Sequence, residues 1–265
     1  MKKIIFTLLA LVGTMSMNAQ IMKIMKGNTV VATYRSTQAD NVVFEEAPTF
    51  PFGQGEAEAT IDGKTVYVKW IQLWENGPKF AEYNVGATSV ADYGGYYTWG
   101  GTYKNGKDIA WNGDYNTGTS KLSGDTDTAT KLWGSNWRMP TNDELGKYDG
   151  DGYYMDPVLC GGLLYECTCT MVTNYNGTGV SGLLCTGKGD YESNSIFLPA
   201  AGFSESSSGV GKVYGLGSRC DYWTSIPKPE GFEYDEHAYS LSHGNQVDTN
   251  FYRSQGISVR AVLNE

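Results

Sequence analysis

Hydrophobic and polar residues alternate in several short runs near the N-terminus, and each run stops at a turn signal. Residues 21–26 and 29–34 flank the Gly-Asn pair at 27–28, a pair that favours a two-residue hairpin turn. Residues 41–45 form a third short alternating run. We therefore predict a small N-terminal β unit over residues 20–47.

A stretch without apolar periodicity follows this unit. Residues 48–56 carry two prolines and two glycines, a composition typical of a linker. Alternation returns at residues 57–61 and 65–70, on either side of an Asp-Gly turn at 62–63. These runs predict a second hairpin, which opens a main domain over residues 57–265.

The centre of the chain combines loop composition with two helix signals. Residues 83–124 are dense in Gly, Tyr, Asn and Trp, which favours long ordered loops with aromatic anchors. Residues 127–133 are a first helix candidate. Thr141 and Glu144 have the spacing of a capping box just before Leu145, which predicts a second short helix.

The last hundred residues return to β-branched and aromatic runs separated by glycine-rich gaps. The predicted strands lie at residues 165–172, 182–186, 194–199, 221–224, 237–242 and 257–263. Hairpins at both ends with two short helices between them predict an α+β fold of antiparallel strands. A doubly wound parallel sheet would require strands alternating with long helices.

The first residues have the order of a secretory signal peptide. Lys2 and Lys3 precede the apolar run at 4–12, and small residues at 17–19 follow it. The run is shorter than the about 20 residues that span a bilayer, and no later stretch qualifies. We expect residues 1–19 to be removed and the protein to be exported, to the periplasm or the cell surface, without a membrane span. A buried N-terminal core helix is the alternative.

Charge disfavours one class of partner. The chain has 20 Lys and Arg against 29 Asp and Glu, a net charge of −9. Without residues 1–19, 18 basic residues face 29 acidic ones and the net charge is −11. So acidic a surface repels phosphate backbones, which disfavours nucleic-acid binding. With 40% hydrophobic residues the chain can fill a core, so it is not a disordered protein.

The odd number of cysteines leaves at least one thiol free or bonded to another chain. Spacing cannot assign bridges among Cys160, Cys167, Cys169, Cys185 and Cys220. On a strand, Cys167 and Cys169 would point to the same face. Because only two histidines are present, zinc ligation is a weak hypothesis, and buried, unreactive cysteines are the favoured interpretation.

Six segments occur together in a characteristic order. They are NVGA at 84–87, DYGGYYTWG at 92–100, WGSNWRMPT at 133–141, SIFLPAAG at 195–202, YWTS at 222–225 and GISVR at 256–260. Over residues 57–265 the chain thereby resembles the Fibrobacter succinogenes major paralogous domain of exported Bacteroidota proteins. The resemblance implies a C-type-lectin-like fold, with long ordered loops, two short helices and antiparallel strands, often preceded by a short strand module. It implies no particular activity.

Within these segments we predict structural roles for Trp137, Arg138, Pro140 and Arg260. Trp137 and Pro140 lie where the second helix begins, a usual place for a core anchor. The two arginines are flanked by apolar residues in a chain poor in basic residues. We expect each to form a buried or half-buried ion pair, with Asp143, Glu144 or an acid of the loops as partner.

Reactive constellations are weak in this sequence, which predicts that the protein is not an enzyme. His237 and His243 are interpreted as surface or turn residues, and no nucleophile elbow accompanies them. The resemblance implies an architecture related to that of formylglycine-generating enzymes, which use a cysteine pair near the C-terminal end of the fold. In this chain Cys220 is the only cysteine in that part of the sequence. The spacing Asp125-Thr126-Asp127 lacks the glycine and distal glutamate of a calcium loop, so we expect no cofactor and leave a structural calcium ion open.

The remaining candidate chemistry is recognition by loops. Residues 203–224 and 239–253 combine Tyr and Trp with Ser, Gly and Asn, as antibody paratopes do. In lectin-like folds this late region forms the ligand face, by resemblance. The candidate ligand-binding residues are Tyr214, Arg219, Tyr222, Trp223, Tyr239, His243, Asn245, Asp248, Asn250, Tyr252 and Arg253.

The leading hypothesis is therefore an exported, non-enzymatic binding or adhesion protein that recognises a glycan or a protein ligand. One alternative is a structural subunit of a cell-surface assembly whose N-terminal strands extend a partner's sheet. A second alternative is a surface glycan hydrolase using carboxylate pairs such as Asp125/Asp127 or Asp235/Glu236. The sequence leaves the oligomeric state open.

Overall fold

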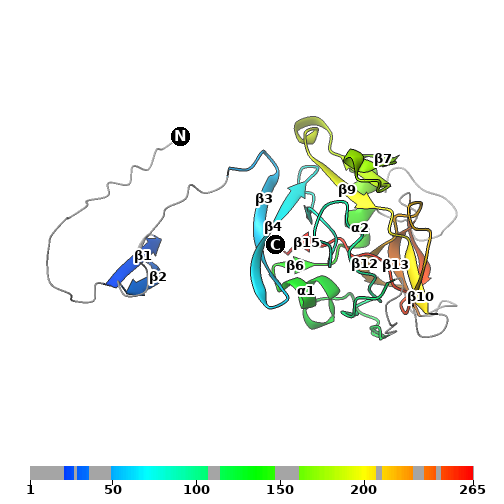
Figure 1. The fold of residues 1–265 in the computed structure, drawn as a ribbon, viewed down its shortest axis with the longest axis horizontal. Coiled ribbons are helices and arrows are strands. Elements are labelled where there is room, and N and C mark those ends of the chain that lie inside the picture. Colours follow the sequence, from blue (N-terminus) through cyan, green and yellow to red (C-terminus); the bar gives the residue numbers. More distant parts are fainter. Residues whose placement is uncertain are drawn as a thin grey trace. The chain divides into compact units, whose positions relative to one another are not determined.

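The chain divides into two compact units, Met1–Thr49 and Phe50–Glu265. The structure, a computed structural model, describes residues 21–26, 29–35, 49–106, 114–146, 161–206, 211–228, 236–242 and 246–264 (Figure 1). In the first unit, β1 (Ile21–Lys26) pairs antiparallel with β2 (Thr29–Arg35), which confirms the first predicted hairpin. The third predicted strand, at 41–45, lies outside the described residues.

A five-stranded sheet joins the beginning and the end of the second unit. Its order is β3-β4-β5-β15-β6, and every pairing is antiparallel. The strands are β3 (Gln54–Ile61), β4 (Lys64–Gln72), β5 (Lys79–Ala81), β15 (Val262–Leu263) and β6 (Trp137–Arg138). Figure 1 shows the C-terminus beside these strands.

The second predicted hairpin is confirmed and is longer than expected. β3 begins at Gln54, inside the segment interpreted as a linker, because Gln54 and Gly55 continue the ladder opposite Ile71 and Trp70. At the turn, Asp62 has a φ of 51° and Gly63 a φ of 72°. Two consecutive left-handed residues match the twist of the flanking strands, which is why Asp-Gly fits this position.

Three further sheets, also antiparallel, build the rest of the unit. The strands are β7 (Thr168–Val172), β8 (Gly182–Thr186) and β9 (Ser195–Pro199) in one sheet, β10 (Phe203–Ser206) and β11 (Gly211–Tyr214) in the next, and β12 (Tyr222–Pro227), β13 (His237–Ser242) and β14 (Gln246–Tyr252) in the last. Together with the short helices, these sheets confirm the α+β class.

The helices are short. They are α1 (Thr128–Trp133), α2 (Asn142–Leu145) and α3 (Leu163–Glu166), with 3₁₀ turns η1 (Gly124–Thr126), η2 (Tyr175–Gly177) and η3 (Gly189–Tyr191). The two predicted helices are α1, where Asp127 accepts a hydrogen bond from the Thr130 amide at 3.0 Å, and α2. No helix in the described ranges is long and apolar enough to cross a membrane.

Two late strand predictions need correction. Residues 165–172 do not form one strand, because Tyr165 and Glu166 belong to α3, whose Leu163 is buried in the core. Only residues 262–263 of the run at 257–263 enter a sheet; Ile257 and Ser258 make single bridges to Tyr97 and Tyr222. In both runs tertiary contacts override the local β pattern.

Two hydrophobic clusters form the core, and the sheet β12-β13-β14 lies between them. Each of its strands contributes to both clusters. Trp223, Ala238 and Phe251 pack into the first, which also holds Trp99, Trp133 and Trp137. Tyr222, Leu241 and Val247 pack into the second, with Leu198 and Phe80. Side chains of the late sheet, where they are described, therefore pack on both of its faces, while Tyr252 of β14 is 42% exposed.

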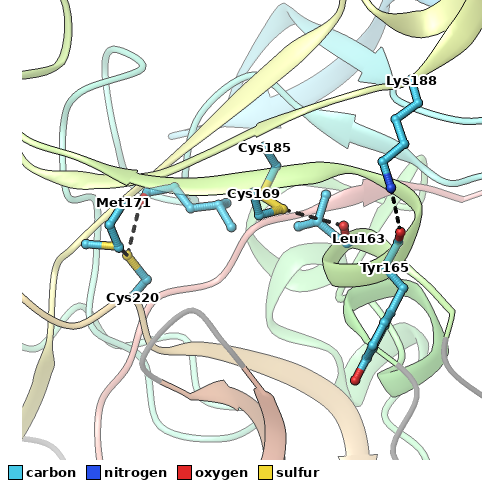
Figure 2. Close-up of a disulfide and its surroundings, with 8 residues drawn as sticks. Leu163, Tyr165, Cys169, Met171, Cys185, Lys188 and Cys220 are labelled. Carbon is cyan, nitrogen blue, oxygen red and sulfur yellow. Dashed lines mark hydrogen bonds between the residues drawn. A yellow bond between two sulfur atoms is a disulfide. The ribbon is translucent and has the colours of Figure 1, made fainter. Parts of the chain in front are cut away.

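A disulfide bonds Cys169 of β7 to Cys185 of β8, and the two residues are direct cross-strand partners (Figure 2). The spacing of the cysteines left the bridges unassigned, and the structure assigns this one. Cys167 and Cys220 are buried free thiols, and burial raises the pKa of each to about 12. Cys167 caps the C-terminus of α3, so it does not share a strand with Cys169. Cys160 lies outside the described residues.

The guanidinium of Arg260 ties three separate segments together. It is fully buried and donates to the carbonyls of Ala81 (2.9 Å), Glu82 (2.8 Å) and Phe197 (2.7 Å), and to the Asn84 side-chain oxygen (2.9 Å). None of these four acceptors is a carboxylate, so the predicted ion pair is wrong for Arg260. Burial lowers the pKa of Arg260 to about 10, and it stays charged at neutral pH.

We expect Arg260→Lys to lower the free energy of unfolding by about 3 kcal/mol, because one ammonium cannot satisfy four acceptors that point along a planar fork. Urea denaturation measures the change. Lys212→Ala, at an exposed position, is the control and should stay within about 0.5 kcal/mol of the parent. An Arg260→Lys variant as stable as the parent would show that only the charge matters.

Candidate functional site

Of the residues around α2 with predicted structural roles, two are buried and the third forms an ion pair. Trp137 is fully buried, and its indole donates to the Glu58 carbonyl at 3.0 Å. Pro140 is buried, and its carbonyl accepts from the Ser225 amide at 2.7 Å. Arg138 forms a bidentate pair with Glu144, at 2.6 and 2.8 Å. The Glu144 carboxylate also accepts a hydrogen bond from the Thr141 amide at 2.7 Å. Glu144 therefore completes the capping box and holds Arg138 at the same time.

Tyr222 and Trp223, two candidate ligand contacts, have no exposed surface. The Tyr222 hydroxyl donates to the Pro199 carbonyl at 2.8 Å and accepts from the Asn84 amide at 3.1 Å. The Trp223 indole donates to the Tyr97 carbonyl at 2.7 Å. Because both side chains are fully buried and their polar atoms are satisfied inside the protein, we assign these two residues to the core and not to a ligand surface.

Arg253 is also a structural residue. It is almost completely buried, and its guanidinium lies over the Trp99 ring at 4.5 Å. It donates to the carbonyls of His237 (2.9 Å) and Gly118 (2.8 Å). Arg253 therefore fastens the loop at 114–118 to the late sheet, and the prediction that it contacts a ligand is withdrawn.

Tyr214 and Arg219 are half-buried and belong to one stacked arrangement. Tyr214 stacks on Phe203 at 5.3 Å between ring centroids, and Lys212 Nζ lies 4.8 Å from the Tyr214 ring. The Arg219 guanidinium lies over the Phe203 ring at 4.9 Å and pairs with the buried Asp221 at 2.9 Å. We call the surface made by Lys212, Tyr214, Leu216 and Arg219 the late patch.

The late patch has one exposed aliphatic residue and a fixed backbone. Leu216 is 51% exposed at the turn between Gly215 and Ser218. Gly215 has a φ of 69°, and an added Cβ would lie 2.5 Å from Arg219 Cδ, so glycine lets the arginine pack against the turn. The side chains of the patch therefore stand on a turn that has little freedom.

Tyr252 and Tyr239 occupy different environments. Tyr252 is 42% exposed, and its ring meets the ring of His237 edge-on at 4.1 Å. His237 is buried on β13, so its interpretation as a surface or turn residue is wrong. Tyr239 is half-buried and packs against the second cluster, and its carbonyl accepts from the Thr224 hydroxyl at 2.9 Å.

Four candidates stay predictions. His243 and Asn245 lie outside the described residues, and for Asp248 and Asn250 the structure describes the backbone of β14 alone. Asp127 was a candidate calcium ligand, but its carboxylate accepts hydrogen bonds from the backbone amides of Thr130 and Met139. In the ranges that the structure describes, no three His, Cys, Asp or Glu residues converge as a metal site would require.

A cleft that the sequence pattern did not predict lies elsewhere in the second unit. It has a volume of about 400 Å³ and is lined by Phe52, Trp74, Glu75, Glu166, Lys188, Asp190 and Tyr191. One of its aromatic residues, Phe52, lies in the segment predicted as a linker. The available signal was the unusual position of Phe52, a large apolar residue between prolines and glycines that no helix or strand pattern explains.

Comparison with known proteins returned no relatives: no family model, no curated protein and no solved structure matches this chain. Its geometry therefore has to carry the functional argument.

Acid should weaken the fold through Glu144. Burial alone would raise the pKa of Glu144, but the hydrogen bonds and charge of Arg138 and the Thr141 amide outweigh burial and lower it. A lowered pKa contributes stability above the unfolded value of about 4.3, and this stability is lost as the pH falls through the folded value. We expect Glu144→Gln to cost about 2 kcal/mol at pH 7 and progressively less below pH 4.

Urea denaturation between pH 3 and pH 7 measures this difference. Glu75→Gln, at an exposed position, is the matched control and should show no such convergence with the parent. A constant gap between the parent and Glu144→Gln across the range would contradict the assignment.

Proposed function

We propose that this chain is an exported binding protein that recognises a protein ligand through the late patch, on a C-type-lectin-like frame. The observation that carries the proposal is the stack of Lys212, Tyr214, Phe203 and Arg219, with Leu216 exposed beside it. Tyrosine and arginine are enriched at the energetic centres of protein interfaces. Tyrosine also supplies contact area at a low cost in conformational entropy.

The exposure of Leu216 on a turn favours a protein over a small molecule as the ligand of the patch. Small ligands bind in concave sites that enclose most of their surface. Three clefts within the described ranges are lined by residues of other segments. An exposed turn with aromatic and cationic side chains instead suits a complementary protein surface, where an exposed leucine is covered on binding.

The surroundings of the reactive side chains support binding over cysteine chemistry. A cysteine nucleophile needs a lowered pKa, whereas burial raises the pKa of both free thiols described here. Cys220 contacts the Met171 sulfur at 3.8 Å and the Leu198 carbonyl at 3.4 Å, so it packs as an apolar residue (Figure 2).

The test is an array of purified extracellular proteins and glycans, probed with the chain lacking residues 1–19. We expect a protein ligand whose Kd rises at least about tenfold when Tyr214→Ala and Leu216→Ala are combined. Tyr67→Ala is the matched control, because Tyr67 is 65% exposed on β4 and lies outside the patch. Absence of any protein ligand, or equal affinity of the double variant, would refute the proposal.

A second candidate function rests on the N-terminal hairpin. β1 and β2 form a two-stranded sheet in their own unit, and such a hairpin is only marginally stable alone. Adding a strand from a partner would satisfy an open edge. By this hypothesis the chain is a subunit of a surface assembly, and the hairpin anchors it.

Deleting residues 20–47 tests the anchor. The second unit keeps both hydrophobic clusters, so it should fold, as circular dichroism can verify. We expect the deletion to move the protein from the sedimenting envelope fraction to the supernatant, while the late-patch double variant stays in the pellet. Continued sedimentation of the shortened chain would exclude the anchoring role.

A further inference from the structure

We propose that the cleft around Phe52, Trp74 and Tyr191 is a binding site for an uncharged oligosaccharide. The cleft shares no residue with the late patch, so the inference goes beyond the proposed function and does not depend on it. Four segments supply its walls: the turn before β3, the loop after β4, the end of α3 and the η3 turn.

Three aromatic side chains offer the apolar surface. Phe52 is 64% exposed and lies 5.0 Å from the Tyr191 ring, tilted by 47°. Trp74 is half-buried, with its indole 6.1 Å from the buried Phe80 ring. The face of an aromatic ring is negative, and it attracts the polarised C–H groups on one face of a sugar ring. An exposed phenylalanine side chain is unfavourable in water, and a ligand that covers it removes its apolar surface from water. A ligand would therefore explain why a phenylalanine stands at this exposed position.

The backbone that carries these rings is held by one buried side chain. Asn194 is fully buried; its amide nitrogen donates to the carbonyls of Phe52 and Gln72, both at 2.9 Å, and its oxygen accepts from Gln54 at 2.7 Å. The Asn194 backbone amide donates to the Tyr191 carbonyl at 2.9 Å. Asn194 therefore joins the Phe52 turn, the end of β4 before Trp74, and the turn that carries Tyr191.

The close packing at Gly53 makes this arrangement specific. Gly53 has a φ of 69°, and a Cβ there would lie 2.7 Å from the Asn194 amide nitrogen and 3.0 Å from the Tyr191 ring. Only glycine allows so close an approach at that backbone angle. The fourth wall is tied in by Lys188, whose ammonium donates to the Tyr165 carbonyl of α3 at 3.0 Å (Figure 2). A preformed cleft loses little entropy on binding.

The polar groups identify the class of ligand. Glu75, Glu166 and Asp190 are exposed hydrogen-bond acceptors, and Lys188 keeps donors beyond the one that it uses. A sugar hydroxyl both donates and accepts, so it can use acceptors and donors side by side. The three carboxylates would repel an anionic chain, and the Lys188 ammonium would repel a cationic group placed beside it. The mixed set therefore favours a neutral, hydroxyl-rich chain.

The contact between Phe52 and Tyr191 argues against a cage for a quaternary ammonium group. Such cages hold several ring faces around one empty centre. Here the two rings touch each other and form a wall beside Trp74, a shape that accepts flat sugar rings laid along it.

The test is calorimetric titration of the chain lacking residues 1–19, with neutral hexasaccharides of glucose, xylose, mannose and N-acetylglucosamine, up to about 10 mM. Choline and an oligogalacturonate are the cationic and anionic probes. We expect at least one neutral hexasaccharide to bind and neither charged probe to do so. Binding of a charged probe alone, or no binding by any neutral chain, would overturn the proposal.

Variants locate the binding. Phe52→Ala changes an exposed side chain and should raise the Kd for the hexasaccharide at least about tenfold, and Tyr191→Ala should do likewise. Tyr67→Ala, an equally exposed aromatic on β4, and the late-patch double variant should both bind as the parent does. Equal affinity of Phe52→Ala and the parent would place the sugar elsewhere and refute the site.

Discussion

Four hydrogen bonds from the buried Arg260 guanidinium connect the end of β5, the loop at Asn84 and strand β9. A charge taken out of water is stable only when all its donors are satisfied, so the three segments must close around it together. Asn84 extends the constraint, because its amide nitrogen donates to the Tyr222 hydroxyl of the late sheet. The five-stranded sheet, the β7-β8-β9 sheet and the late sheet thus meet at one cation, and the loops between them are positioned from it.

The packing of these segments around Arg260 also explains why tyrosine and tryptophan residues of the late strands, whose composition resembles an antibody paratope, lie in the core. β12, β13 and β14 each contribute residues to both clusters, so the described aromatic residues of β12 pack into the core. Aromatic residues there satisfy their polar atoms internally: Trp223 and Tyr222 donate to the carbonyls of Tyr97 and Pro199. Tyrosine and tryptophan have an apolar body and one polar atom, which suits a buried contact as well as an interface. Composition alone does not separate the two.

What the sequence predicted well was local. Hairpins with Gly-Asn and Asp-Gly turns, the capped helices and strand 237–242 depend on neighbours along the chain, and they were confirmed. The Arg138–Glu144 pair, six residues apart, was within reach of the same reasoning. Arg260 was not, because its acceptors lie more than 60 residues away and three of the four are backbone oxygens, which no side-chain pattern marks. Neither was the Cys169–Cys185 bond, which needs the β7–β8 register.

The cleft illustrates that limit most clearly. Its aromatic rings come from positions 52, 74 and 191. The residue whose hydrogen bonds connect their segments, Asn194, stands in the sequence only as the first residue of the predicted strand 194–199. A buried amide that satisfies two distant carbonyls and one distant side chain is costly to place and loses its hydrogen bonds if any segment moves. Core packing alone does not explain why a buried asparagine holds this turn, because the Phe52 side chain on the turn remains 64% exposed. A fold that fixes an exposed ring so firmly has the arrangement expected of a surface that something else completes.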